Sequence, residues 1–217
     1  MKKQSSSLEI QSFIGGFDSN LSYLITDLSN QIHWVIDPAV PLKFMRNFIK
    51  YECSHIFITH SHFDHIIYLN EYCTAFPNST IICHPSASIN SEKCRINNIA
   101  DGDQVISGSI KIEVLYTPGH SPDSLCFKMR NEIFTGDTIF VGRTGRVISV
   151  GSNIHQLFDS VYNKILNLPA SFVIYPGHDY GLQSKIALSD NIAISPLLRA
   201  KNESDFIKKM MEYESNR

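Results

Sequence analysis

Short apolar runs alternate with polar turn residues along most of the chain, which is typical of β-strands joined by tight loops. Near the N-terminus the runs are bounded by a Gly-Gly pair, a Ser-Asn pair and Asp37-Pro38, so we expect a β-meander there. Runs rich in β-branched and aromatic residues predict further strands later in the chain. The expected strands are 8–14, 21–26, 32–36, 54–59, 80–83, a hairpin across 105–116, 125–128, 132–134 and 171–175.

Helical spacing of apolar residues occurs between these runs. The clearest case is 153–168, where Ile154, Leu157, Val161 and Ile165 fall on one face. The other expected helices are 42–49, 66–76 and 204–214. Because strands and helices are mixed and polar clusters follow strand ends, we expect layered sheets with helices outside and functional loops along one edge.

The composition is that of a globular protein. The 217 residues are 43% hydrophobic and 18% charged, with a formal net charge of −2. These values exclude a disordered chain, and no apolar run is long enough for a membrane span. No cluster of Lys and Arg is present, so we expect no nucleic-acid partner. We expect one domain over 1–217, with a short helical tail at about 186–217.

The cysteines and the N-terminus bear on the compartment. The five cysteines are spread along the chain and never form a C-x-x-C pair, so we expect reduced, buried thiols. The first residues lack the apolar core of a secretory signal. We therefore expect a cytoplasmic protein.

The densest chemical motif follows the strand expected at 54–59. Potential metal ligands occur here at His60, His62, Asp64 and His65. Neutral imidazole nitrogens and carboxylate oxygens bind borderline divalent ions well. One ion could not readily take all four ligands and keep an open position. The simplest interpretation is two adjacent ions that both bind ligands from this loop.

Three further segments place a ligand just past a strand end, beside a glycine that lets the backbone turn. They contribute His120, Asp137 and His178. Asp137 is the natural bridge, because a carboxylate has two oxygens and can reach both ions while offsetting part of their charge.

This ordered set, His60-x-His62-x-Asp64-His65 followed by His120, Asp137 and His178, resembles the metallo-β-lactamase superfamily of hydrolases. The resemblance implies an α+β fold, a four-layer αββα sandwich with the metal site at one edge of the two sheets. It also implies a distribution of ligands between two ions. The first would be held by His60, His62 and His120, the second by Asp64, His65 and His178, with Asp137 as the bridge.

Within the superfamily, the segments 134–140 and 176–180 and the Gly145-Arg146 pair are similar to the branch of glyoxalase II (hydroxyacylglutathione hydrolase) and persulfide dioxygenase. Both act on glutathione adducts. Glyoxalase II has glutathione-contacting residues where Arg146 and Tyr180 fall, and it has a second tyrosine where this chain has Ile148. Arg143 is a further candidate for binding a substrate carboxylate, with a structural ion pair as its alternative.

The resemblance implies hydrolysis of a thioester, such as an acyl-glutathione, by a metal-bridging hydroxide, with Asp64 and Asp137 as catalytic residues. Two divalent ions are expected, zinc first, with iron or manganese as alternatives. The alternative activity is that of a mononuclear iron persulfide dioxygenase acting on glutathione persulfide, which would use His60, His120 and Asp137 as iron ligands. The expected partner is a small-molecule substrate, with a glutathione conjugate as a candidate and no membrane. A homodimer is left open.

Overall fold

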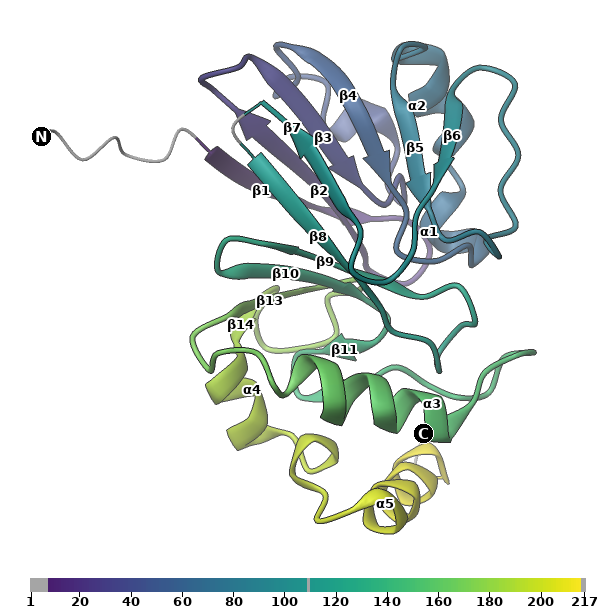
Figure 1. Ribbon diagram of the computed structural model, residues 1–217, viewed down its shortest axis with the longest axis vertical. Coiled ribbons are helices and arrows are strands. Elements are labelled where there is room, and N and C mark those ends of the chain that lie inside the picture. The colour runs from purple at the N-terminus through teal and green to yellow at the C-terminus, as the bar shows by residue number, and fades with distance from the viewer. Residues whose placement is uncertain (1–7, 109, 216–217) are drawn as a thin grey trace, which may run out of the picture.

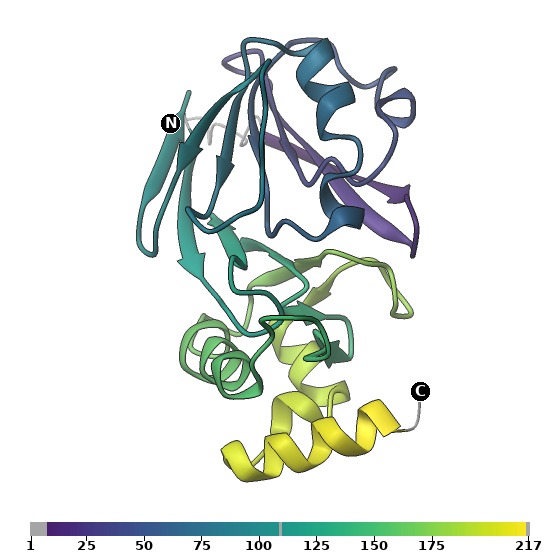
Figure 2. The same cartoon turned by 90° about the vertical axis from the view of Figure 1, so that its right-hand side faces the viewer.

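The computed structural model describes residues 8–108 and 110–215. Two six-stranded sheets face each other, and helices cover the outer face of each sheet (Figures 1 and 2). These four layers form the αββα sandwich expected from the sequence.

The first sheet has the order β1-β2-β3-β4-β5-β6. Its strands are β1 (Leu8–Gly15), β2 (Asn20–Asp27), β3 (Ile32–Ile36), β4 (Glu52–Phe57), β5 (Thr80–Cys83) and β6 (Arg95–Asn98). The first three strands form the expected antiparallel meander, and β3 to β6 pair in parallel. Because β3 and β4 are parallel neighbours, Asp37 after β3 and His60 after β4 reach the same edge.

The second sheet has the order β14-β13-β10-β9-β8-β7. Its strands are β7 (Gln104–Ser107), β8 (Ile110–Tyr116), β9 (Leu125–Met129), β10 (Glu132–Gly136), β13 (Val173–Pro176) and β14 (Ile186–Ala187). A small hairpin of β11 (Ile139–Phe140) and β12 (Arg143–Thr144) lies beside it. β8 and β10 are both antiparallel to β9, and β13 is parallel to β10. These three strands therefore end at one edge, where His120, Asp137 and His178 follow them.

Helices α1 (Phe63–Ile66) and α2 (Leu69–Ala75) cover the first sheet, and α3 (Ile154–Asp159) and α4 (Leu188–Ile194) cover the second (Figure 1). The last helix, α5 (Glu203–Ser215), packs against α3 on the side away from the sheet. α3 continues as a π-helical segment, Ser160–Ile165. The tail expected at about 186–217 is largely helical in its described part. Its last helix packs on the helical layer, since Phe206 and Met210 of α5 are buried with Val161 of the π-helical segment. In the described ranges no helix combines the length and apolar character of a membrane span.

Three apolar layers hold the sandwich together. The central layer lies between the sheets and includes Trp34 and Phe57 from one and Phe127 from the other, with the Phe57 and Phe127 ring centroids 5.1 Å apart. The outer layers join each sheet to its helices. Burial of these side chains supplies the main driving force for folding, and it positions the strand ends that carry the site.

Two predictions about local structure were wrong. The helix expected at 42–49 is only a 3₁₀ turn, Leu42–Phe44, which begins after Pro41 with no side-chain cap. A segment this short cannot offset the cost of helix nucleation. The helix expected at 66–76 begins earlier and is broken into α1 and α2. β6 was not predicted, because an edge strand of sequence Arg-Ile-Asn-Asn shows no apolar alternation.

Candidate metal centre

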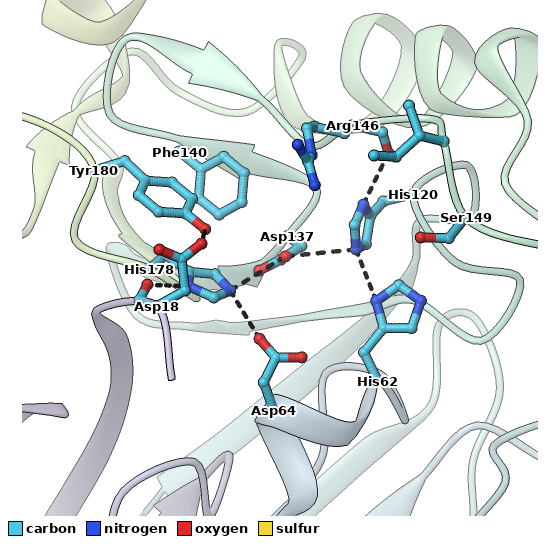
Figure 3. Close-up of a pocket in the computed structure, with 11 residues that line it drawn as sticks. Asp18, His62, Asp64, His120, Asp137, Phe140, Arg146, Ser149, His178 and Tyr180 are labelled. Carbon is cyan, nitrogen blue, oxygen red and sulfur yellow. Dashed lines mark hydrogen bonds and ion pairs between the residues drawn. The ribbon is translucent and has the colours of Figure 1, made fainter. Parts of the chain in front are cut away.

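The seven candidate ligands meet at the edge where the strand ends of both sheets come together. Figure 3 shows side chains from this set turned toward one another, with Asp137 between His120 and His178. The first-sheet ligands lie in the loop after β4 and at the start of α1. The others follow β8, β10 and β13. Segments distant in sequence therefore build a single polar cluster.

Three histidines form the first group. The Nδ1 atom of His62 lies 3.0 Å from His60 Nε2 and 3.0 Å from His120 Nε2. The ligand atoms of all three residues lie within 4.8 Å of one another. His60 and His120 are buried and His62 is partly buried. Burial and the neighbouring imidazoles lower the pKa of His60 and His62, which favours the neutral form that binds metals.

Asp64, His65 and His178 form the second group. His178 Nε2 lies 3.3 Å from Asp64 Oδ2 and 3.2 Å from His65 Nε2. All three ligand atoms fall within the same 4.8 Å limit. Asn20 donates a hydrogen bond of 2.9 Å from Nδ2 to Asp64 Oδ2, which holds the carboxylate at the centre.

Asp137 lies between the two groups. Its Oδ2 atom is 3.4 Å from His120 Nε2 and 3.4 Å from His178 Nε2, one residue from each group. Its Oδ1 atom is 3.2 Å from His65 Nε2, but this buried oxygen makes no hydrogen bond within the described part of the chain. A buried carboxylate oxygen without a hydrogen-bond donor is costly unless a cation binds it. The donor set therefore fits divalent ions of the kind that histidine and aspartate ligate.

Backbone and side-chain oxygens fix the orientation of three histidines through Nδ1, which leaves Nε2 facing the centre. The pairs are His65 with Asp37 Oδ2 at 2.9 Å, His120 with the Arg146 carbonyl at 2.9 Å, and His178 with the Asp18 carbonyl at 2.7 Å. When Nδ1 carries the proton, Nε2 presents its lone pair to a metal.

Asp37 is a site residue that sequence reasoning missed. It is 2% exposed, and besides His65 it accepts hydrogen bonds from the backbone N–H of Thr59 at 2.8 Å and from the Thr59 hydroxyl at 2.7 Å. Its φ of +50° is a left-handed conformation that aspartate tolerates. The available signal was an acidic residue directly after a strand, which we interpreted only as part of a turn. Asn20 was also missed, and it carries no comparable signal.

The electrostatics of the second group differ from those of the first. Burial opposes a charge on His178, but hydrogen bonds to Asp137 and Asp64 outweigh it and raise its pKa from 6.5 to about 9. The pKa of buried His65 is likewise raised, because Asp137 and Asp37 overcome the desolvation. Burial favours the neutral form of Asp137, but the positive charge of His65 outweighs this effect and holds the pKa of Asp137 well below its usual range. In the metal-free centre, the positive charges of protonated His65 and His178 therefore offset the negative charges of the carboxylates.

This balance predicts that the metal-free protein loses stability as pH rises. Because the folded pKa of His178 lies above the ordinary value, its contribution is complete below pH 6.5 and is lost as pH passes about 9. The carboxylates stay ionised throughout this window and contribute no slope. We expect the free energy of unfolding to fall by up to about 3 kcal/mol between these limits. Urea unfolding of chelator-treated protein at both pH values would measure it. A His178→Gln variant should show a smaller decrease, and an equal decrease would contradict the assignment.

A pocket with a volume of about 160 Å³ opens directly above the cluster. Besides ligand residues, it is lined by Arg146, Ile148 and Ser149 from one segment and by Asp18 and Tyr180 from others (Figure 3). The cluster is therefore accessible to a small molecule.

The three predicted substrate contacts occupy different positions. Arg146 and Tyr180 line the pocket. The Tyr180 ring stacks on His178 at 4.8 Å, and its hydroxyl donates to Asp18. Arg143 does not line the pocket: its guanidinium lies 3.9 Å from the Tyr180 ring centroid and donates to the Tyr213 hydroxyl. It contacts the pocket wall from behind.

Known proteins with similar sequences include two hydrolases. A hydroxyacylglutathione hydrolase from Francisella tularensis subsp. novicida (strain U112) is 33% identical over 175 residues, covering 78% of this chain and 67% of that protein. The probable polyketide biosynthesis zinc-dependent hydrolase PksB of Bacillus subtilis (strain 168) is 27% identical over 176 residues, covering 79% of this chain and 78% of its own length. The chain thus spans about two thirds of the length of the Francisella hydrolase.

Solved structures show the same fold. ETHE1 from Myxococcus xanthus is 28% identical with a TM-score of 0.82, over 94% of this chain and 91% of that one. A metallo-beta-lactamase from Staphylococcus aureus subsp. aureus COL is 26% identical with a TM-score of 0.80, and the match covers 96% of this chain and 67% of that one. Residues 15–178 match the family described as the metallo-beta-lactamase superfamily. That span includes every candidate ligand, and the chain belongs to the metallo-β-lactamase superfamily.

Proposed function

We propose that the protein is a dinuclear metal-dependent hydrolase that cleaves a thioester. The position of Asp137 carries the proposal, because its Oδ2 atom lies at the same 3.4 Å from a histidine of each ligand group. A carboxylate between two complete groups suits a pair of ions better than one. Hydroxyacylglutathione hydrolases are among the similar proteins, which makes an acyl-glutathione a candidate substrate.

Bound divalent ions would supply Lewis acidity and lower the pKa of a water to near neutrality. The first ion would be held by His60, His62 and His120, and the second by Asp64, His65 and His178, with Asp137 shared. We propose zinc, since PksB is described as zinc-dependent, with iron or manganese as alternatives.

The chain's own residues then position the reaction. Asp64 lines the pocket and is held by Asn20, so its carboxylate is placed to orient an attacking water. Arg146 is placed to bind an anionic group of the substrate, and Tyr180 forms the wall beside His178. A thiolate is a weak base, so no residue is required to protonate the leaving group fully.

The experiment is elemental analysis of anaerobically purified protein, followed by thioester assays on the same sample. We expect two zinc ions per chain and hydrolysis of an acyl-glutathione or of a neutral acyl thioester. Protein that holds two zinc ions and cleaves neither kind of thioester would contradict the proposal.

The second candidate is a mononuclear iron persulfide dioxygenase, which the likeness to ETHE1 favours. Here His60, His120 and Asp137 would bind the iron. Oxygen uptake on glutathione persulfide separates the two activities. One iron per chain with rapid uptake would establish this alternative, and zinc-containing protein without uptake would exclude it.

A further inference from the structure

Large apolar side chains lie exposed on the segments that surround the pocket. Phe17 and Phe63 are 68% and 66% exposed, Ile148 is 60% exposed, and Val150 and Leu182 are fully exposed. Exposed apolar residues scattered singly are ordinary, whereas a group of them around a site indicates a surface that a ligand or partner covers.

These residues lie within two positions of residues that line the pocket, and Ile148 lines it directly. Phe17 precedes Asp18, and Phe63 lies between the ligands His62 and Asp64. The two rings contact each other with centroids 5.8 Å apart, although they come from the turn after β1 and the start of α1. They form an aromatic pair at the pocket mouth.

Ile148 adds apolar surface within the pocket, and Val150 and Leu182 lie close to lining residues in the sequence. Ile148 lines the pocket itself, and Val150 follows the lining residue Ser149. Leu182 lies two residues after Tyr180. Figure 3 shows Asp18, which follows Phe17, on one side of the pocket and Ser149, which follows Ile148, on the other.

The polar groups of the pocket offer little to a highly charged substrate. Apart from the histidines of the two ligand groups, Arg146 is the only cationic side chain among the described residues that line it, and Asp18 adds a carboxylate beside Asp64 and Asp137. The hydroxyl of Tyr180 already donates to Asp18. One substrate carboxylate could pair with Arg146, and Ile148 together with the neighbouring Phe17–Phe63 pair offers apolar surface to the rest of the substrate.

We infer that the thioester substrate carries an apolar chain, which packs on the rim formed by Phe17, Phe63 and Ile148. This inference rests on the proposed hydrolase function and names the class of substrate. Ile148 lines the same pocket as the ligands, and Phe17 and Phe63 adjoin residues that line it, so the chain attached to the reacting carbonyl lies within their reach. Covering these side chains removes apolar surface from water, which strengthens binding in proportion to chain length.

The first test is a series of thioesters of one small neutral thiol, N-acetylcysteamine, with acetyl, butanoyl, hexanoyl and octanoyl chains. We expect kcat/KM to rise about two- to fourfold per added methylene until the rim is covered. A flat or falling series would overturn the inference.

The second test repeats the series with the double variant Phe17→Ser, Phe63→Ser. Both side chains are exposed, so the variant should keep its fold, and its thermal midpoint would verify this. We expect the increase of kcat/KM with acyl-chain length to become clearly smaller in this variant. An unchanged slope would overturn the inference. Ile106→Ser is the matched control, because Ile106 is 68% exposed but pairs with Lys111 at the start of β8, the strand end opposite to His120. It should leave the slope unchanged.

A third measurement separates this inference from the proposed reaction. S-ethyl and S-octyl thioethers of N-acetylcysteamine cannot be hydrolysed, so calorimetric binding to the metal-loaded protein reports on the rim alone. If thioesters are not cleaved but the S-octyl compound binds more tightly, the hydrolase proposal fails and the apolar subsite stands. Equal binding of the two thioethers would overturn the subsite. So would a dimer that dissociates in the double variant, because a second copy would then cover the rim.

Discussion

Asp137→Asn should lower kcat/KM for thioester hydrolysis by at least about 10³-fold and reduce the bound metal to at most one ion per chain. Asparagine keeps the shape of the side chain, but it removes the charge and replaces one oxygen by an amide group that cannot ligate. The Oδ2 atom, which lies 3.4 Å from both His120 and His178, could then no longer serve both groups. Metal analysis and steady-state kinetics on the same preparation would measure both effects.

The same variant has a readout that needs no metal. A hydrogen bond to Asp137 is the largest contribution that raises the pKa of His178, so the asparagine should move that pKa down from about 9. NMR titration of metal-free protein would follow it. Asp190→Asn is the control, since Asp190 is exposed in the first turn of α4. Full metal content in Asp137→Asn would contradict the bridging role.

Asp37→Asn should weaken metal binding to the Asp64, His65 and His178 group by about 10- to 100-fold while the fold is kept. Asp37 Oδ2 lies 2.9 Å from His65 Nδ1 and accepts a hydrogen bond from its N–H group. An amide group at that position would donate instead, so the proton of His65 would move to Nε2 and block the lone pair that faces the centre. Asparagine also tolerates the left-handed backbone at this residue. Competition with a chelator, monitored for each ion, would measure the loss.

Asp27→Asn is a matched control for this variant. Asp27 is also a buried aspartate of the first sheet, and it accepts hydrogen bonds from the backbone N–H groups of Ser29 and Asn30. It lies at the opposite end of β2 from Asn20 and the metal centre. Asp27→Asn should lower the free energy of unfolding without changing the metal content. If both variants lose metal equally, or neither does, Asp37 has no specific effect on His65.

The positions of most of the longer strands and the residues of the candidate ligand set could be predicted from the sequence. β3 and β5 were predicted with their observed bounds, because both are compact apolar runs between turn residues. The ligands were recognisable because histidine and aspartate residues beside glycines recur after strand ends. Their convergence follows from topology: β8, β10 and β13 run in the same direction, so the segments after them share one edge.

Features that depend on tertiary contacts could not be predicted. Asp37 resembles any turn residue until β3 is paired with β4, which brings it to Thr59 and His65. Arg143 looks like a substrate-binding residue until β12 and α5 pack together and place it between Tyr180 and Tyr213. The prediction of a helix at 42–49 was wrong for a related reason, because apolar spacing alone does not show whether the neighbouring elements let a helix extend beyond one turn.

The two sheets are built from consecutive halves of the chain, residues 8–98 and 104–187, and each half contributes to both ligand groups. The first half supplies His60 and His62 to one group and Asp64 and His65 to the other, and the second half completes them with His120 and His178. Neither half alone has a full set. During synthesis, the first sheet can assemble on its own strands, but the metal centre can form only when His178 has joined the second sheet and the two sheets have docked. Metal capture would therefore come late in maturation and would clamp the halves together.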